Sequence, residues 1–197
     1  MIRSFIAIDI PEDVRAALTE MQAQLKQAQL DVKVSWAKVE NLHLTLQFLG
    51  DIPEDVVPKI SASLEAVAGK HEVFAVPVGG VGAFSTANRA RVLWVGCKDA
   101  DGRLKSLARA VQGAMKEFGF APEQREFAAH LTLGRVKLPR PDVTLTRLLD
   151  SLKDTACGTL GVEAIHLFQS QLHPAGSIYT KLSSHRLKGE REHGRQS

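Results

Sequence analysis

Hydrophobic and polar residues alternate along several short segments of the chain, and this pattern predicts β-strands. The segments expected as strands are 3–10, 32–37, 41–49, 71–78, 91–97, 127–136, 162–169 and 177–182. Apolar residues three or four positions apart predict helices that begin near Pro11, Pro53, Leu104 and Leu145. A glycine cluster, Gly79, Gly80 and Gly82, predicts a turn after the strand at 71–78.

Strands and helices alternate, but short glycine-rich or polar turns join several of the strands. Such turns favour antiparallel neighbours over a purely parallel sheet, so we predict an α+β fold. The segment from Ser183 onward has little apolar content and many charges, which is typical of a frayed terminus. We therefore expect one folded domain over residues 1–184 and a charged, flexible tail over 185–197.

Composition narrows the class of protein only in part. The 197 residues suffice for one domain or for two small lobes, and 44% hydrophobic with 24% charged residues is ordinary for a soluble protein. The net charge of +3 is compatible with an anionic substrate without indicating one. The two cysteines, Cys97 and Cys157, form no Cys-x-x-Cys pair, which argues against a zinc knuckle or a redox motif.

The N-terminus reaches Asp9 after a short apolar stretch and does not resemble a signal peptide. No run approaches the roughly 18 apolar residues that a membrane span requires. The expected location is therefore the cytoplasm, without membrane association.

The tetrapeptide His-Leu-Thr-Leu occurs twice, beginning at His43 and at His130. The two histidines are 87 positions apart, close to half the chain, and the helix and strand pattern around them also recurs. This self-similarity indicates a duplicated unit whose halves are related by a pseudo-twofold axis.

Side chains of a strand alternate between its two faces. The leucines of each motif are expected to point into the core, while His43, Thr45 and Gln47 point the other way, as do His130 and Thr132. If the two halves face each other across a groove, two imidazoles and two hydroxyls converge on one point.

This set of groups suits hydrolysis of a phosphate ester without a metal. A histidine with a pKa of ~6.5 can act as general base or general acid, and each such proton transfer contributes ~10²–10⁴-fold. Threonine hydroxyls can donate hydrogen bonds to the phosphoryl oxygens. One His-x-Thr would indicate only a solvated sheet face, but its duplication favours a site. A metal site is disfavoured because neither histidine has a second ligand at a usual spacing, such as His-x-x-x-His.

Further segments extend the pattern carried by the two motifs. They are SFIAID at 4–9, WAKVENLHLTLQFLG at 36–50, GAF at 82–84, RVLWVG at 91–96, and SQL at 170–172 followed by Tyr179. On these segments the chain resembles the two-histidine phosphoesterases, and more narrowly the RNA 2′,3′-cyclic phosphodiesterases, also called 2′-5′ RNA ligases. The resemblance spans about residues 2–182; one departure is Ala129, where that family often has proline.

The resemblance implies a bilobal fold with duplicated halves, each with an antiparallel sheet and helices, around a central cleft. It implies opening of a 2′,3′-cyclic phosphate to a 2′-phosphate without cofactor or metal, and the reverse reaction as 2′-5′ ligation. By analogy His43 is the proton donor to the leaving 3′ oxygen, and His130 is the proton acceptor that activates water. The expected partners are RNA ends bearing the cyclic phosphate, such as those of tRNA fragments, or cyclic nucleotides. A monomer is expected because the pseudo-twofold axis is internal.

Two further residues are candidates for binding. Ideal alternation places Arg135 on the face opposite His130, unless Gly134 forms a bulge that redirects it. The resemblance makes Arg135 a phosphate contact, with a surface arginine as the alternative. Phe5 is a candidate for stacking on a base, although a core position on the first strand is the favoured interpretation. Other histidines lack a matched partner and are expected to be non-catalytic, namely His71, His166, His173 and His185.

Two other functions remain open at this point. The same groove would serve a non-catalytic RNA-binding module, whose binding would weaken with salt but which would form no product. It would also serve a phosphodiesterase acting on another small cyclic phosphate, which turnover of such compounds would distinguish from an RNA-end enzyme.

Overall fold

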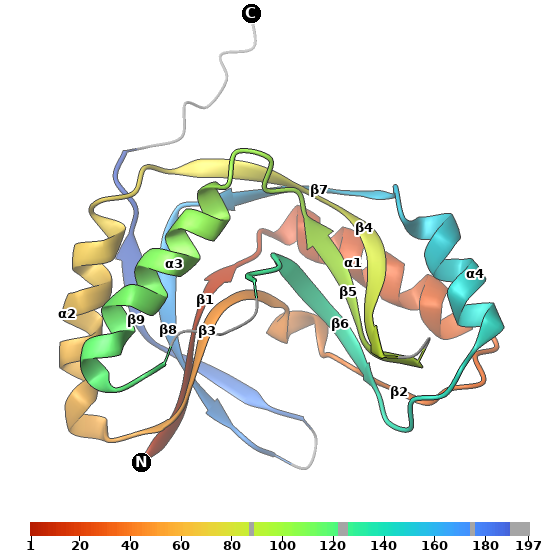
Figure 1. Ribbon diagram of the computed structural model, residues 1–197, viewed down its shortest axis with the longest axis horizontal. Coiled ribbons are helices and arrows are strands. Elements are labelled where there is room, and N and C mark those ends of the chain that lie inside the picture. Colours follow the sequence, from red (N-terminus) through yellow and green to blue (C-terminus); the bar gives the residue numbers. More distant parts are fainter. Residues whose placement is uncertain (87–88, 122–125, 174–175, 190–197) are drawn as a thin grey trace, which may run out of the picture.

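The computed structural model describes residues 1–86, 89–121, 126–173 and 176–189 (Figure 1). Its strands are β1 (Ile2–Asp9), β2 (Val34–Trp36), β3 (His43–Ile52), β4 (Phe74–Thr86), β5 (Arg89–Cys97), β6 (His130–Val136), β7 (Ala156–Val162), β8 (Ala164–Gln171) and β9 (Ile178–Arg186). The helices are α1 (Glu12–Gln27), α2 (Val57–Ala68), α3 (Arg103–Met115) and α4 (Val143–Leu152), with 3-10 turns η1 (Val39–Asn41), η2 (Glu54–Val56) and η3 (Lys116–Phe118).

The strands of the described segments form one sheet in the order β7-β4-β5-β6-β3-β1-β8-β9, with β2 beside β6. Every pair of neighbouring strands is antiparallel, which confirms the predicted α+β class. The central strands β3 and β6 pair only through Leu44 and Leu131. The sheet therefore consists of two half-sheets, β3-β1-β8-β9 and β7-β4-β5-β6, joined at one point.

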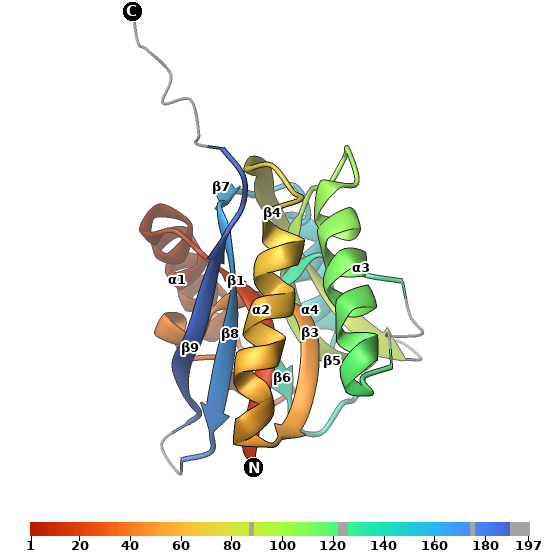
Figure 2. The ribbon, with the colours of Figure 1, turned by 90° about the vertical axis from the view of Figure 1, so that its left-hand side faces the viewer.

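Helices cover the two half-sheets in pairs (Figures 1 and 2). Helix α2 packs on β8 and β9 and helix α3 on β3, while α1 packs on β7 and α4 on β4. Helix α1 comes from the first half of the chain yet covers the second half-sheet, and α3 has the reverse arrangement. Each half of the chain therefore supplies one helix to the half-sheet that contains the motif strand of the other half. Neither half-sheet has a complete core without that helix.

The leucines of the two motifs lie in this shared core. Leu44, Leu46, Leu131 and Leu133 are each no more than 2% exposed and belong to one continuous apolar cluster. Burial of apolar surface contributes roughly 25 cal/mol per Å², so these strands are held firmly against the helices. The predicted inward direction of the leucines is confirmed.

Both motif strands contain a β-bulge at the same position of the repeat. Two neighbouring residues of β1 pair with Thr45 and Gln47 of β3, so Leu46 is the extra residue of the first bulge. Two neighbouring residues of β5 pair with Thr132 and Gly134 of β6, so Leu133 is the extra residue of the second. A bulge reverses the alternation of side chains beyond it, so the residues after each bulge face differently from the simple prediction.

A buried glutamine holds the carbonyl of each bulge. The Gln22 amide on α1 donates to the Leu133 carbonyl at 2.9 Å, and that carbonyl also accepts from the Ala37 N–H. The Gln112 amide on α3 donates to the Leu46 carbonyl at 3.4 Å. Each bulge is therefore stabilised by the helix that the other half of the chain provides, since a buried carbonyl needs a donor.

The predicted turn at Gly79, Gly80 and Gly82 is wrong, because β4 runs through all three glycines. Gly80 has a φ of 76° next to an irregularity in the β4–β5 ladder, a conformation that glycine adopts without strain. At Gly82 an added Cβ would lie 2.4 Å from the Trp94 ring, so this glycine permits close packing. These glycines shape a strand instead of ending one.

The C-terminal boundary also differs from the prediction. The strand expected at 162–169 is β8, and the preceding strand β7, which ends at Val162 with one residue between it and β8, was not predicted. Strand β9 continues to Arg186, and both His185 and Leu187 are 4% exposed, so the predicted boundary at residue 184 is wrong. The polar end of β9 stays in the sheet because the His185 ring bonds the Glu65 carboxylate at 2.8 Å. Residues 190–197 of the expected tail lie outside the described residues.

Both cysteines are buried, and burial raises the pKa of the Cys97 thiol to about 12.

Among the described residues, every helix is too short or too polar to span a lipid bilayer.

Replacing Gln22 with methionine tests the support of the second bulge. The variant keeps the side-chain volume but removes the amide donor to the Leu133 and Ala37 carbonyls, each at 2.9 Å. We expect a loss of about 1–3 kcal/mol in the free energy of unfolding, measured in urea, because the Ala37 carbonyl loses this donor and the Leu133 carbonyl keeps only the Ala37 N–H. The matched control is Gln24→Met on the exposed side of α1, which should stay within about 0.5 kcal/mol. Equal stability of the two variants would contradict the assigned support.

Candidate active site

The single contact between β3 and β6 brings the two motifs together. Leu44 and Leu131 are opposite each other in antiparallel strands. The same register sets His43 opposite Thr132 and Thr45 opposite His130, all on the face away from the leucines. In this register His43 and His130 are diagonal to each other, and the charge of His130 lowers the pKa of His43, so the two rings lie near enough to interact. Each histidine is thus opposite the threonine of the other motif.

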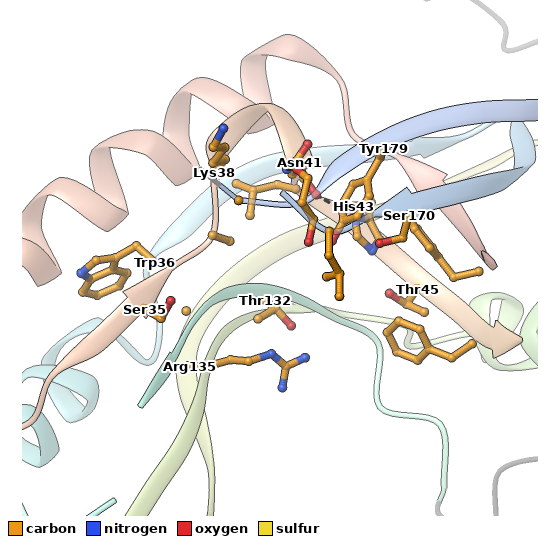
Figure 3. Close-up of a pocket in the computed structure, with 18 of the residues that line it drawn as sticks. Ser35, Trp36, Lys38, Asn41, His43, Thr45, Thr132, Arg135, Ser170 and Tyr179 are labelled. Atoms are coloured by element: carbon orange, nitrogen blue, oxygen red, sulfur yellow. Dashed lines mark hydrogen bonds between the residues drawn. The ribbon is translucent and has the colours of Figure 1, made fainter. Parts of the chain in front are cut away.

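A cavity of about 420 Å³ opens over this junction (Figure 3). Thr45 and Thr132 lie on facing sides of its centre, and Arg135 reaches into the same space. His43 lines the cavity from the β3 side. His130 is not among the lining residues. The register places it opposite Thr45, and Thr45 does line the cavity.

Both histidines are oriented in the same way by the backbone. The His43 Nδ1–H donates to the carbonyl oxygen of Asn41 at 2.7 Å, and the His130 Nδ1–H donates to that of Ala128 at 2.6 Å. In each case the acceptor lies two residues before the histidine. A carbonyl can only accept, so Nδ1 carries the proton and Nε2 is the nitrogen left for chemistry.

The environments of the two rings differ. The His43 ring stacks on Phe5 with centroids 4.6 Å apart and meets the edge of Tyr179 at 5.3 Å. Burial lowers the pKa of His43; the Asn41 carbonyl and the Asp9 carboxylate oppose that shift, and His130 adds to it. His130 meets the edge of Phe84 at 4.8 Å and is only partly buried. Both histidines are half-buried, but two aromatic rings pack on His43 and one meets His130, so the two equivalent positions differ in their surroundings.

Asp9 is a charged neighbour of His43 that the sequence patterns did not single out as a site residue. It is opposite His43 in the β1–β3 ladder. Its carboxylate bonds the Lys181 ammonium at 2.5 Å and lies 3.7 Å from His166 Nε2. Mainly through burial, the pKa of His166 falls to about 4, so His166 is a neutral member of this network. The Asp9 carboxylate therefore favours the charged form of the His43 imidazole.

Arg135 and Gln47 show what the bulges do to the site. The bulge at Leu133 turns Arg135 to the cleft, where it is exposed and lines the cavity, so the predicted redirection is confirmed. The equivalent bulge at Leu46 turns Gln47 into the core, where it is 2% exposed. The prediction that Gln47 shares a face with His43 is therefore wrong, and Phe48 takes that place.

Phe5 lines the floor of the cavity, but its ring is almost fully buried. The rings of His43 and Phe168 flank it at 4.6 and 5.2 Å, both stacked, and only 3% of its surface is exposed. A base cannot reach a ring whose faces are covered in this way. The favoured interpretation as a core residue is confirmed, and the candidate role in base stacking is wrong.

Some residues that line the cavity belong to no motif that indicates a catalytic or binding role in the sequence. Ser35, Trp36, Lys38 and Tyr179 line the cavity (Figure 3). Of these, Trp36, Lys38 and Tyr179 fall in or next to the segments that carried the family resemblance, which was the only signal available. The Asn41 side chain donates to the Ser177 carbonyl at 2.6 Å and so links the start of β3 to the segment just before β9.

Other histidines have partners elsewhere in the structure. His71 bonds the Val67 carbonyl at 2.9 Å, His166 bonds Ser184 at 2.8 Å, and His185 bonds Glu65. None of these three lines the cavity. Within the ranges given above, no three His, Cys, Asp or Glu side chains lie together as metal ligands.

Comparison with known proteins matches this duplicated architecture. The family model described as LigT like Phosphoesterase matches residues 8–94 and again 95–179. The chain belongs to this family. The two matched ranges each contain one of the two motifs, so the predicted duplication and the family resemblance are both confirmed.

Relatives of similar length lie within the same family. The chain is 34% identical over 186 residues to a protein of Methanothermobacter thermautotrophicus, covering 94% of this chain and 99% of the relative. It is 36% identical to a protein of Aeropyrum pernix, covering 79% and 87%. Both relatives are named RNA 2′,3′-cyclic phosphodiesterase.

Solved structures share the fold of this LigT-like phosphoesterase. A protein of Thermus thermophilus superposes with a TM-score of 0.78 at 28% identity, covering 96% of this chain and all of that one. LigT of E. coli in complex with 3′-AMP has a TM-score of 0.74 at 22% identity, covering 95% and 99%. The bilobal fold with duplicated halves is therefore confirmed.

The protonation of His43 can be followed by NMR. Burial keeps the pKa of His43 below its usual value of 6.5 in the free protein. An anion bound in the cavity would favour the charged ring, so we expect saturating inorganic phosphate to raise this pKa. Long-range ¹H–¹⁵N spectra recorded against pH measure it, and Asp9→Asn should lower it further because a favourable charge is lost. An unchanged or lower pKa with phosphate would contradict this site for the anion.

Proposed function

We propose that this LigT-like phosphoesterase hydrolyses the 2′,3′-cyclic phosphate at RNA ends to a 2′-phosphate, with His43 and His130 as general acid and general base. The observation that supports the proposal is the pairing of Leu44 with Leu131, whose register sets each motif histidine opposite the threonine of the other motif. The names of the archaeal relatives supply the substrate class.

The chemistry needs one proton to be taken and one to be given. The neutral Nε2 of His130 removes a proton from water as the water oxygen bonds to phosphorus. The bond between phosphorus and the 3′ oxygen breaks, and the protonated Nε2 of His43 gives its proton to that oxygen. The products are a 2′-phosphate and a 3′-hydroxyl, and solvent exchange restores both imidazoles. Each transfer contributes ~10²–10⁴-fold to the rate.

The unequal environments support this division of roles. His130 is partly exposed, so water can reach its free nitrogen. His43 is enclosed, and its lowered pKa makes the protonated ring a stronger acid once the substrate phosphate and Asp9 hold the proton there. A general acid of this kind gives up its proton readily as the leaving oxygen develops charge.

The remaining polar groups stabilise the phosphoryl oxygens. The hydroxyls of Thr45 and Thr132 point toward the centre of the cavity, where they can donate to the two non-bridging oxygens (Figure 3). Arg135 brings a positive charge to the same space. Preorganised donors aimed at developing charge are typically worth ~10²–10³ in kcat each.

The same groups can act in reverse. If the 5′-hydroxyl of a second RNA takes the place of water, His130 deprotonates it, it bonds to phosphorus as the 3′ oxygen leaves with the proton of His43, and the ends are joined through a 2′-5′ bond; with the acid and base roles exchanged, the site would cleave that bond again. Both half-sites come from one chain, so the proposed active form is a monomer.

Single replacements of the two histidines test the proposal. We expect His43→Ala and His130→Ala each to lower kcat on an RNA ending in a 2′,3′-cyclic phosphate by ~10²–10⁴-fold. The double variant should be little worse than either single one, because the two residues act as a unit. His71→Asn, outside the cavity, is the matched control and should keep wild-type activity. Wild-type turnover by either alanine variant with an intact fold would refute the roles.

A companion assay separates the alternatives. The phosphate position of the product is read by ³¹P NMR, and activity is compared with and without excess EDTA. A 2′-phosphate formed in the presence of the chelator agrees with the proposal. RNA binding without any product would identify a binding module instead.

A further inference from the structure

The β2–β6 ladder continues past the cavity and ends in two lysines that lie opposite each other. Ser35 pairs with Arg135, and both residues line the cavity. Two positions further along, the Lys137 N–H donates to the Lys33 carbonyl at 2.9 Å, so the same register sets Lys33 opposite Lys137. The intervening Val136 is 7% exposed and belongs to the core, which places both lysines on the cleft face by alternation. We call Lys33 and Lys137 the lysine pair.

No carboxylate of the described residues forms an ion pair with the lysine pair or with Arg135. All three cationic side chains are exposed. The Asp142 carboxylate accepts the N–H of Val32, next to Lys33. It is 5% exposed and also accepts the N–H of Leu145, so its oxygens are turned to the backbone. Like charges directly opposite each other in a sheet are destabilising, so an anion bound between the two ammonium groups would relieve a repulsion in the free protein.

Arg140 extends the cationic surface beyond the lysine pair. Its side chain is exposed, and its guanidinium donates to the Asp31 carbonyl, two residues before Lys33. The lysine pair itself lies two strand residues beyond Arg135, or roughly 6.6 Å. Positive side chains therefore follow one another from Arg135 in the cavity, along the end of β2 and β6, to Arg140.

The rim of the cavity formed by β1 and β3 carries charges of both signs instead. Arg3 lines the cavity there, but it is opposite Asp51 in the β1–β3 ladder. Glu54 and Asp55 follow shortly after in η2. All four of these side chains are exposed. A chain of phosphates would meet both attraction and repulsion at this rim, whereas at the lysine pair the two residues that face each other are both cations.

We propose that the lysine pair binds backbone phosphates of the RNA chain upstream of the terminal nucleotide, so that the RNA leaves the cavity along the end of β2 and β6. The inference rests on the proposed function and adds a second contact region, separate from the site of the chemistry. Lysines contact phosphates as point charges and read no base, so this contact is independent of the RNA sequence.

A phosphate contact outside the cavity makes chain length a determinant of the substrate. Lys137 is five strand steps from Leu131 when the bulge residue Leu133 is left out, or roughly 16.5 Å. The single phosphate of a cyclic mononucleotide must lie at the β3–β6 junction to react, so it cannot reach the lysine pair at the same time. An RNA has further phosphates that can. The lysine pair should therefore raise the affinity for RNA and leave the reaction itself unchanged.

The test compares a cyclic mononucleotide with a single-stranded RNA oligonucleotide, both ending in a 2′,3′-cyclic phosphate. We expect the double variant Lys33→Ala/Lys137→Ala to lower kcat/KM on the RNA roughly 3- to 25-fold at low salt, mainly through KM, because two exposed phosphate contacts are lost. Its kcat/KM on the cyclic mononucleotide should change by no more than about twofold, since this substrate makes neither contact.

The salt dependence of binding is a readout that a merely structural role would not move. Affinity for the product RNA, which ends in a 2′-phosphate, is measured by fluorescence anisotropy over a range of salt concentrations. The slope of log affinity against log salt should become shallower by about 1.4 in the double variant, since each contact to a single strand accounts for about 0.7. Two RNAs of equal length and different sequence should show the same loss.

Matched variants control for charge and for folding. Lys33→Arg/Lys137→Arg keeps both charges and should keep most of the affinity for RNA. Lys59→Ala/Lys116→Ala removes the same net charge from exposed positions on α2 and η3, and should change neither the substrate preference nor the salt slope. Loss of one lysine of the pair should not lower the free energy of unfolding in urea, because a repulsion is relieved.

The outcomes distinguish this inference from the proposed function. If the wild type does not hydrolyse the RNA, the proposed function fails and the inference fails with it. If the wild type is active but the variant without the lysine pair loses equally on both substrates, or keeps the wild-type salt slope, the RNA does not follow the lysine pair. A loss restricted to the RNA in Lys59→Ala/Lys116→Ala would place the RNA chain on the helices instead.

Discussion

One pair of residues, Leu44 and Leu131, joins the two half-sheets, and the geometry of the site depends on it. Because only this pair connects β3 and β6, the strands are free to diverge on either side and leave room for a cavity between them. The junction still fixes the register, so the two histidines and two threonines cannot shift relative to each other without moving both strands. A packed core on the opposite face resists such movement, because protein interiors tolerate little void or overlap.

The paired bulges add the second constraint. They reverse the alternation of β3 and β6 beyond the threonines and bring Phe48 and Arg135 to the cleft. Each bulge leaves a carbonyl that the ladder does not use, and Gln22 or Gln112 from the helix of the other repeat donates to it. The exchange of helices between the halves thus connects the fold to the site: neither half can form its own bulge support alone.

A duplicated scaffold provides two equivalent histidines, whereas acid–base catalysis needs them to differ. The structure resolves this through their surroundings. His43 is enclosed by Phe5, Tyr179 and the carboxylate of Asp9, while His130 is more open beside Phe84. Burial and neighbouring charge act on the pKa of the first ring in opposite directions, so its protonation becomes sensitive to whether an anion is bound.

Local patterns were sufficient to predict most elements and the two motifs, because alternation and helical spacing depend on neighbours in the chain. The direction of Gln47 could not be predicted, since the bulge at Leu46 has no local signal comparable with Gly134. The contact of Leu44 with Leu131 joins distant segments and is set by the whole sheet. Strand β9 extends past the predicted end because the buried His185 bonds Ser61 and Glu65 on α2, which composition does not show.

The most direct test of the account is a crystal structure of the protein with a nucleoside 2′-monophosphate, the product of the proposed reaction. The account predicts the phosphorus over the β3–β6 junction, with Nε2 of both His43 and His130 within ~2.7–3.2 Å of oxygens on that one phosphorus. A phosphate held by one histidine alone, or bound away from the junction, would contradict it.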